Sequence, residues 1–384
     1  MMHNLLSSWL DTQKRKHTLV LMFVDFRKAF DSICHNKLVT KLIEIGLEGN
    51  LLKMLRSYLT DRHQCVKVQE KTSKFLPLST GVPQGSILSP TLFQIYLNDL
   101  LSLPLLSSAH AYADDVTIYI SDKNHMLLQQ RINTDLLQIQ QWCDQNNLTI
   151  NLKKSHYVIV NEPENFKISI SLPQGDLQQK TTSTLLGFTI NNRLTWHDHL
   201  QQLSSKIASN MRLFYNLRHL MDFKTATQFY QNFIHSFLTY GTHLYYALSP
   251  ANLTDPIYRL QKCALRLVCS QLTRTNTHKT PSTLSVVTKV NVLPLPKLSE
   301  YNACILGHNI LNNNCPTYLS SIFAKTHPKR PTRDPYKLPS SASYNRLNQY
   351  LLNSFNTLPK ALRSKANIST FKTSLKLNLM STLH

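Results

Sequence analysis

Residues 19–26 read LVLMFVDF, a short apolar run that ends in an acid, Asp25. The length of the run suits one buried β-strand. A carboxylate at the end of a buried strand is costly unless a hydrogen-bond donor or a positive charge satisfies it. The stretch therefore predicts a core strand and marks Asp25 as a candidate functional residue.

A second acidic segment lies in residues 111–120, which read AYADDVTIYI. The pattern predicts a strand, a turn that carries Asp114 and Asp115, and a second strand. In one interpretation these acids accept backbone hydrogen bonds in an ordinary turn. In the other, adjacent strands bring the carboxylates together around Mg²⁺, which prefers hard oxygen ligands. Two such ions can activate an attacking hydroxyl and stabilise a leaving pyrophosphate.

The rest of residues 1–190 alternates helical and strand patterns, which is typical of an α+β fold. We expect helices over 38–59, 94–106 and 122–147, a hairpin at 64–78, and strands at 148–160 and 184–190. Within 122–147, apolar residues recur every three or four positions, and the Asn146-Asn147 pair is a reasonable stop.

Beyond Thr195 the apolar spacing is helical throughout. One helix is predicted to begin near Ile257, with Asp255 as its cap and Pro256 in its first turn. Thr/Pro-rich residues 271–297 and Lys/Arg/Pro-rich residues 324–341 read as linkers. The tail from 344 to 383 reads as a basic helical pair.

The composition narrows the class of protein. Of 384 residues, 42 are Lys or Arg and 21 are Asp or Glu, so the formal charge is +21. Such an excess favours a polyanionic partner, nucleic acid first and anionic lipid second. The uncharged stretches 75–98 and 225–254 are broken by proline, glycine or polar residues, so we expect no membrane span. Seven scattered cysteines without a CxxC pair indicate reduced core thiols in an intracellular protein.

Residues 81–86 read GVPQGS. Glycines in such a loop allow the backbone to approach a ligand closely, and proline stiffens the approach. Taken alone, the segment is better read as an ordinary loop. Its order and spacing relative to the two acidic segments change that interpretation.

Together, VDFRKAFD at 24–31, GVPQGS at 81–86 and YADD at 112–115 resemble successive motifs of reverse transcriptases. The likeness is strongest to those of LINE-type (non-LTR), jockey-like retrotransposons. NLKKS at 151–155 resembles the next motif, and LLGF at 185–188 resembles the one after it. The tail also resembles the end of such proteins, so the likeness covers essentially the whole chain.

The resemblance implies an α+β fold with a right-hand polymerase palm in 1–190, most of its fingers missing. An all-helical thumb in 191–275 would follow, and then a linker and a basic helical region in 276–384. The family carries fingers and an endonuclease upstream of its first acid, whereas this chain begins 24 residues before Asp25. We therefore expect an N-terminally truncated fragment.

The resemblance also implies roles for single residues. Asp25 and Asp114 would bind two Mg²⁺ ions, with Mn²⁺ as an alternative, and Asp115 would be a third catalytic acid. Lys154 would lie near the triphosphate and act as a general acid for pyrophosphate, although a solvated surface lysine is nearly as good a reading.

Substrate contacts are implied for Phe26, Phe30, Gln84 and Gly85. Phe30 would lie under the incoming sugar and exclude a 2′-hydroxyl, and the alternative is an aromatic residue of the core. A turn that holds the primer end, the primer grip, is implied at Leu186 and Gly187, and contacts to a nucleic-acid backbone are implied at Lys206, Arg212 and Arg218.

The implied function is RNA-directed DNA synthesis from an RNA template, a DNA primer and deoxynucleoside triphosphates. One alternative is a catalytically inactive relic that still binds RNA or RNA–DNA duplex through its charge. A second is a metal-dependent nuclease that uses the same acids. The nuclease reading explains the carboxylates but neither the 81–86 loop nor Phe30.

Overall fold

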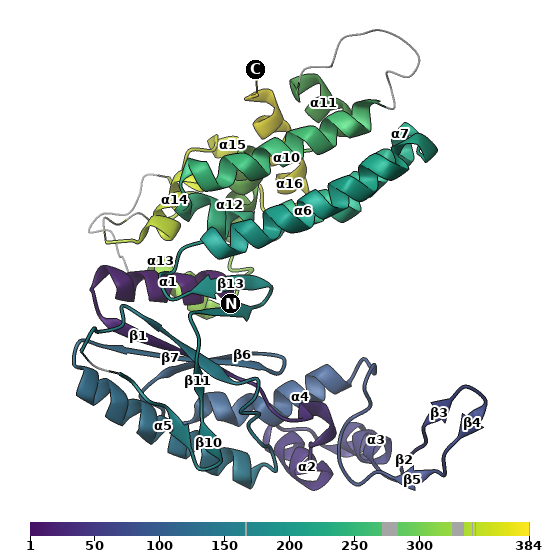
Figure 1. Cartoon of the computed structure of the whole chain (residues 1–384), viewed down its shortest axis with the longest axis vertical. Coiled ribbons are helices and arrows are strands. Elements are labelled where there is room, and N and C mark those ends of the chain that lie inside the picture. The colour runs from purple at the N-terminus through teal and green to yellow at the C-terminus, as the bar shows by residue number, and fades with distance from the viewer. Residues whose placement is uncertain (166, 271–282, 325–333, 340, 342, 384) are drawn as a thin grey trace. The chain divides into compact units, whose positions relative to one another are not determined.

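The computed structural model describes every residue except 166, 271–282, 325–333, 340, 342 and 384. The chain divides into two compact units (Figure 1). Thr12–Leu185 form the sheet unit, and Met1–Asp11 with Leu186–His384 form the helical unit. This division differs from the three predicted domains, because it places the first 11 residues with the C-terminal half. The three domains stay a prediction.

The sheet unit is built on five strands in the order β11-β8-β1-β7-β6. Their bounds are β1 (Thr18–Val24), β6 (Ser108–Tyr112), β7 (Asp115–Asp122), β8 (His156–Val160) and β11 (Gln178–Gln179). β1 is central and antiparallel to both β7 and β8. Every residue of β1 is buried, which confirms the strand predicted from LVLMFVDF. The predicted strand–turn–strand at 111–120 is confirmed by β6 and β7, but its turn holds Ala113 and Asp114, and Asp115 is already the first residue of β7.

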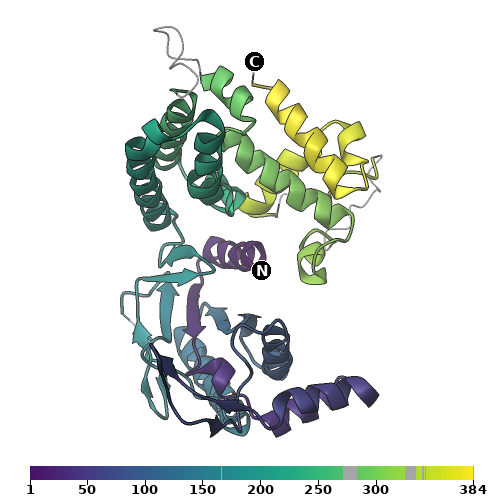
Figure 2. The ribbon, with the colours of Figure 1, turned by 90° about the vertical axis from the view of Figure 1, so that its right-hand side faces the viewer.

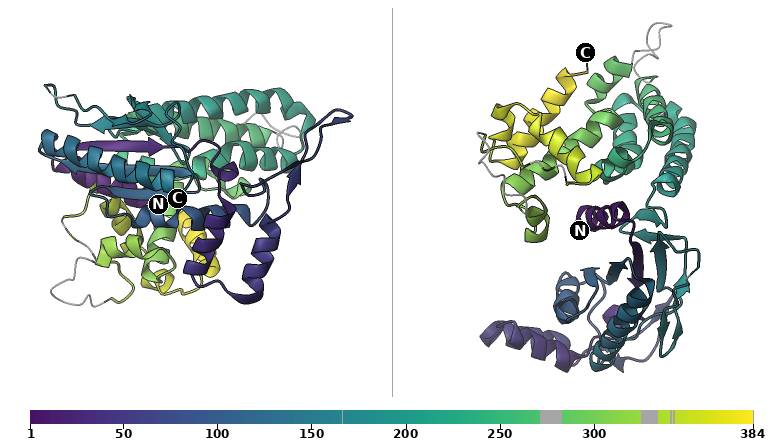
Figure 3. Two further views of the ribbon diagram at one scale, coloured as in Figure 1. Left: turned by 90° about the horizontal axis from the view of Figure 1, so that it is seen from below. Right: turned by 90° about the vertical axis from the view of Figure 1, so that its left-hand side faces the viewer.

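Helices of this unit are α2 (His35–Glu44), α3 (Gly49–Leu59), α4 (Ser89–Leu97) and α5 (His125–Gln145). α5 lies along one face of the sheet, as Figures 1 and 3 show from two sides. The side chain of Asn124 caps α5 by accepting hydrogen bonds from the next turn. α4 begins earlier than the predicted helix at 94–106, because Pro90 is well tolerated in a first helical turn.

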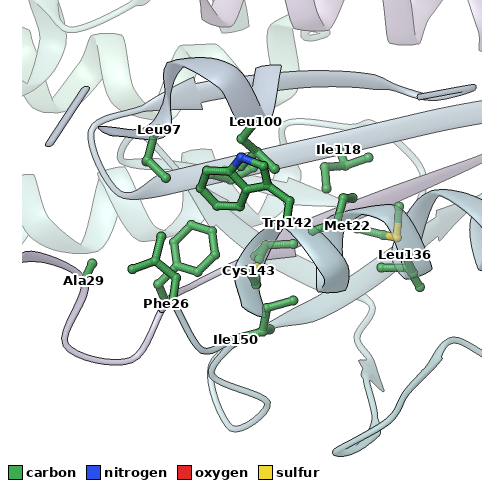
Figure 4. Close-up of a cluster of buried hydrophobic side chains, with 14 of the residues drawn as sticks. Met22, Phe26, Ala29, Leu97, Leu100, Ile118, Leu136, Trp142, Cys143 and Ile150 are labelled. Atoms are coloured by element: carbon green, nitrogen blue, oxygen red, sulfur yellow. The ribbon is translucent and has the colours of Figure 1, made fainter. Parts of the chain in front are cut away.

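The core of the sheet unit lies between the sheet and α5 (Figure 4). Met22 from β1 and Ile118 from β7 meet Leu136 and Trp142 from α5, and each is at most 4% exposed. Burying a large apolar side chain contributes about 1.5–3 kcal/mol. This cluster therefore holds β1 firmly at the centre of the sheet.

Smaller elements refine two predictions. The expected hairpin at 64–78 is confirmed by β2 (His63–Gln64) paired with β5 (Leu76–Pro77), and by β3 (Lys67–Val68) paired with β4 (Lys71–Thr72). The expected strand over 148–160 is regular only in β8, because residues 152–154 turn. β9 (Ser171–Leu172) and β10 (Gly175–Asp176) complete the unit.

One predicted strand, 184–190, is wrong as a single element. β12 (Thr182–Leu185) ends before Leu186, and β13 (Phe188–Asn191) begins after Gly187. Leu186 and Gly187 have φ angles of 48° and 77°. A strand requires negative φ, so two successive left-handed residues break it into two.

The described part of the helical unit is mainly helical. Its helices are α1 (Met2–Lys14, whose last three residues belong to the sheet unit), α6 (His197–Leu217), α7 (Phe223–Tyr230), α8 (Ser236–Thr239), α9 (Thr242–Tyr245), α10 (Ala251–Ser270), α11 (Thr283–Val290), α12 (Leu295–Leu311), α13 (Thr317–Ala324), α14 (Arg346–Asn356), α15 (Lys360–Arg363) and α16 (Ile368–Ser381). α6 and α10 pack side by side (Figure 1). α12 packs against α14 and α16, which follow it in yellow-green and yellow in Figure 2.

Two predictions in this unit need correction. α10 begins at Ala251 rather than near Ile257, so Pro256 lies inside the helix. The pattern misplaced the start because proline lacks the N–H that an interior position donates, which favours the first turn. α11 and the start of α12 fall in the predicted linker 271–297, where apolar residues such as Val286 are buried. Residues 271–282 of that linker and 325–333 of the other lie outside the described residues.

The tail at 344–383 is helical as predicted, with α15 between α14 and α16. None of the seven cysteines, all within the described residues, forms a disulfide. Cys143, Cys269 and Cys304 are buried as expected, whereas Cys263 on α10 is exposed. In the described chain no helix has both the length and the apolar character that crossing a membrane requires.

Candidate active site

Both acidic segments meet at the same end of the sheet. The last pair between β1 and β7 is Val24 with Val116, so the next position on β1, Asp25, neighbours Asp115. Asp115 also closes the β6–β7 hairpin by pairing with Tyr112. The sequence thus brings Asp25 and Asp115 together through strand register, although 90 positions separate them along the chain.

The tip of this hairpin is tight and strained. Only Ala113 and Asp114 connect Tyr112 to Asp115, and Ala113 has a φ of 52°. The left-handed region costs a non-glycine residue about 1–2 kcal/mol. Asp114 is exposed at this tip, so the side chain predicted as a metal ligand is accessible.

The carboxylates at this end act on one another electrostatically. Burial raises the pKa of Asp115, and the nearby Asp114 and Asp25 carboxylates raise it further. A bound cation would relieve this mutual repulsion, so the donor chemistry fits Mg²⁺. Among the residues that the structure describes, however, no three His, Cys, Asp or Glu side chains are grouped closely enough to hold a metal ion. The acids are neighbours rather than a preformed three-ligand cluster.

Asp25 contacts two side chains from the segment after α5. Lys154 Nζ lies 3.5 Å from Asp25 Oδ2, and Asn151 Nδ2 donates a hydrogen bond of 3.2 Å to Asp25 Oδ1. The side chain of Lys154 is 70% exposed, so this ion pair contributes about 0–1 kcal/mol. The structure therefore brings the predicted general acid next to a predicted metal ligand.

The GVPQGS loop is attached to the turn that follows Asp25. Val82 N donates to Phe30 O at 3.0 Å, and Gln84 Nε2 donates to Asp31 Oδ1 at 3.0 Å. Gly81 has a φ of 85°, and a Cβ there would lie 2.9 Å from the Cα of Asp31. Gly81 is thus required by the close approach of two protein segments, whereas the sequence suggested an approach to a ligand.

This attachment places Phe30, Gln84 and Gly85 around one pocket of about 450 Å³, whose lining is completed by Ser86, Ile87, Ser89 and Pro90. The Phe30 ring is half-buried and stacks on Phe93 with their centroids 4.6 Å apart. Phe30 therefore both packs on a core ring and lines the pocket. Phe26, also predicted to contact substrate, is 4% exposed and belongs to the core.

The predicted primer grip lies in the helical unit. Tyr240 Oη donates a hydrogen bond of 2.7 Å to Leu186 O. Gly187, Lys206 and Tyr240 line a pocket of about 350 Å³, together with His199. Burial, together with the nearby Lys206 ammonium, lowers the pKa of His199 to about 4. Sequence reasoning missed Tyr240, because nothing in the local sequence relates it to a turn 54 positions away.

Of the other two predicted nucleic-acid contacts, Arg212 lies farther along α6 and Arg218 lies just beyond its end. Arg212 lines a separate, largely apolar pocket of about 660 Å³ together with Tyr215 and Arg266. Arg218, just beyond α6, places its guanidinium 3.6 Å from the centroid of the Tyr215 ring. The roles of Lys206, Arg212 and Arg218 stay predictions, and the first two line different pockets.

Comparison with known proteins identifies the domain that carries the acids. The model of the family described as "Reverse transcriptase (RNA-dependent DNA polymerase)" matches residues 2–190. Residues 2–190 are a reverse transcriptase domain. This finding confirms the resemblance inferred from the motifs, and the matched range includes Asp25, Asp114, Asp115 and Lys154.

Curated relatives of the chain are enzymes of mobile elements. The RNA-directed DNA polymerase from mobile element jockey of Drosophila melanogaster is 25% identical over 278 residues, covering 70% of this chain and 30% of that protein. The probable RNA-directed DNA polymerase from transposon BS of the same species is 25% identical over 282 residues, covering 69% and 30%. The chain thus spans under a third of the length of these relatives.

Among solved structures, apo telomerase from Candida tropicalis matches 75% of this chain and 49% of its own, with 14% identity and a TM-score of 0.43. A likeness this weak does not support a conclusion about fold or function. The reverse transcriptase assignment rests on the family match and on the curated relatives.

Proposed function

We propose that this chain carries out RNA-directed DNA synthesis, in which a primer 3′-hydroxyl attacks a deoxynucleoside triphosphate. The observation that carries the proposal is the meeting of Asp25 with the Asp114–Asp115 hairpin at one end of the sheet. The raised pKa of Asp115, which burial causes first and the Asp114 and Asp25 carboxylates add to, supports it, because negative charge gathers where a divalent cation would bind.

In this proposal Asp25 and Asp114 hold two Mg²⁺ ions, and Asp115 adds negative charge beside them. Bound Mg²⁺ supplies activation of the attacking hydroxyl and stabilisation of the leaving pyrophosphate. In the same proposal Lys154 gives a proton to that pyrophosphate, and its Nζ, 3.5 Å from Asp25 Oδ2, supports this role.

The pocket lined by Phe30, Gln84 and Gly85 takes the incoming nucleotide in this proposal. The ring of Phe30 excludes a 2′-hydroxyl from the sugar position. The RNA template and DNA primer are held through the positive charge of the chain, with the turn at Leu186 and Gly187 as primer grip.

A second candidate is a catalytically inactive protein that binds RNA or RNA–DNA duplex, which the formal charge of +21 favours. A nuclease that uses the same acids would leave the GVPQGS loop and its pocket beside Phe30 without a role. The three functions predict different assay results (extension, binding alone, or strand shortening), so one set of assays separates them.

The experiment is extension of an oligo(dT) primer on poly(rA) by the full chain, with Mg²⁺ and then Mn²⁺. An Asp25→Asn/Asp114→Asn double variant is the control. Extension by the parent chain and none by the control supports synthesis. Duplex binding that weakens steeply with salt, without extension, supports the inactive binder, and shortening of either strand supports the nuclease.

A further inference from the structure

The segment after α5 extends the sheet past the end of β1. Ile150 forms an antiparallel bridge with Phe26, and Arg27 N donates to Thr149 O at 2.8 Å. Asp25 lies just before these pairs, so its surroundings are set by residues more than 120 positions later in the sequence.

Both main-chain groups of Asp25 bond to this segment. Asn151 N donates to Asp25 O at 2.8 Å, and Asp25 N donates to Ser155 Oγ at 3.0 Å. Ser155 is 2% exposed, and its own N–H donates to Asn151 O at 2.8 Å, closing the turn. The Cα of Asp25 is therefore fixed by a closed turn with a buried hydroxyl.

The carboxylate of Asp25 is held by the same turn. Oδ1 accepts a hydrogen bond from Asn151 Nδ2 at 3.2 Å, and Oδ2 lies 3.5 Å from Lys154 Nζ. Lys154 is a long, exposed side chain, whereas Asn151 is half-buried and its backbone also bonds Asp25. Of the two partners, Asn151 is therefore the one whose side chain has less conformational freedom.

A neutral amide has an advantage at this position. It orients a carboxylate by donating a hydrogen bond, yet it leaves the negative charge that attracts a cation intact. A lysine or arginine in the same place would cancel part of that charge.

We infer that Asn151 is a positioning residue for Asp25: its amide fixes the rotation of the carboxylate, and Ser155 fixes the main chain beneath it. The ligand served is a divalent cation bound by Asp25. The inference rests on the proposed function only in that Asp25 is a ligand of the cation.

The test is a titration of the full chain with Mn²⁺ alone. Electron paramagnetic resonance measures the concentration of free Mn²⁺ at each step, which gives the affinity. Asn151→Ala removes the amide, and Asn151→Ser keeps a residue suited to the turn but too short to reach the carboxylate. Loss of an outer partner of a metal ligand weakens metal binding by about 10–100-fold, and we expect this for both variants. Asn133→Ala is the matched control, because Asn133 is an exposed asparagine on α5.

Asp25→Asn defines which part of the Mn²⁺ binding belongs to Asp25. If it leaves binding unchanged, the proposed metal site itself is wrong. If it weakens binding while both Asn151 variants match Asn133→Ala, the metal site stands and the positioning role is overturned. Melting curves without metal separate the two kinds of effect, because a merely structural role lowers the melting temperature without changing the Mn²⁺ affinity of the folded chain.

Discussion

The acid end of the sheet unit exposes its titratable side chains, whereas the helical unit buries a pair of histidines. At the acid end, Asp114 and Asp115 are exposed, and partial burial, then the neighbouring Asp114 and Asp25 carboxylates, raises the pKa of Asp115. In the helical unit, the rings of His3 and His243 stack with centroids 6.0 Å apart. Burial lowers the pKa of His3 to about 4, and burial together with His3 lowers that of His243 to about 3.

The histidines are neutral at pH 7, and part of their hydrogen bonding is satisfied inside the unit. His3 Nε2 bonds Asn348 Oδ1 at 2.9 Å, within a buried polar network that includes Ser7. The acids, in contrast, lie next to one another at an exposed hairpin tip. Burial of a titratable group thus accompanies packing, whereas exposed like charges held together by strand register indicate a site that a cation would complete.

The largest expected effect tests the acid end. Asp114→Ala should reduce primer extension about 1,000-fold or more, because a metal ligand supplies several kcal/mol of transition-state stabilisation. Single-turnover extension on poly(rA) measures the rate, and Asp122→Ala, an acid at the far end of β7 that pairs with Arg131, is the comparison. Equal losses in the two variants would remove the distinction between the acid end and the rest of the sheet.

The second prediction concerns the histidine pair. Their pKa values are lower in the folded state than in the unfolded chain, so the unfolded state takes up more protons as the pH falls below about 6.5. Stability should be intact at pH 7 and decline toward pH 4.5, by about 2–3 kcal/mol for each histidine.

Tryptophan fluorescence against pH reports the acid midpoint of unfolding. His243→Phe should move that midpoint to lower pH, whereas His63→Gln, which changes an exposed histidine of β2, should not. An unchanged midpoint in His243→Phe would mean that the pair is hydrated in solution.

The third prediction sharpens the role of the pocket at Phe30. Phe30→Val should raise the ratio of ribonucleotide to deoxynucleotide incorporation about 10-fold, because a 2′-hydroxyl facing the ring lacks a partner, at a cost of about 1–3 kcal/mol. If Phe30 serves only to pack on Phe93, stability falls by about 2–4 kcal/mol instead, and both substrates lose equally. The ratio of the two incorporation efficiencies, with melting curves alongside, decides between them.

The smallest expected effect is at Asp115. Its folded-state pKa is raised, so its ionised form opposes folding, and this penalty appears only as the pH rises above the unfolded value near 3.8. Asp115→Asn should therefore stabilise the chain at pH 7 and leave it unchanged at pH 3. Water screens an exposed carboxyl, so the gain is about 0.5 kcal/mol or less. Asp122→Asn should instead destabilise the chain at pH 7, because it removes the ion pair of Asp122 with Arg131, whose atoms lie 2.6 Å apart.

Sequence periodicity was sufficient for elements whose burial alternates or repeats regularly. β1, the β6–β7 hairpin and α5 were predicted because an apolar run, a two-acid turn and a helical stripe are local signals. The start of α10 was missed, because Pro256 is tolerated inside a helix that tertiary packing supports. The strand pattern over 184–190 also missed the break at Leu186, because the left-handed conformation of a leucine has no local signature, whereas the family resemblance did imply a turn at Leu186 and Gly187.

At the candidate site, the acids and the GVPQGS loop could be recognised as sequence motifs. The residues that hydrogen-bond to Asp25 could not be predicted. Asn151 and Ser155 lie in a segment that was recognised, yet their bonds to Asp25 span 126 and 130 positions. Such contacts depend on the register of β1 with its partners, which one sequence does not specify.

The placement of α1 has a consequence for how the protein is made. Residues 12–185 form one continuous unit, which can fold as soon as it has left the ribosome. His3, however, finds its partner Asn348 only 345 positions later. At about 5–20 residues per second, the first helix waits roughly 20–70 s for the segment that completes its surroundings. During that interval its apolar face, which includes Leu5 and Trp9, is open to other chains on the same messenger RNA, so we expect chaperones to bind this helix until its partners have been made.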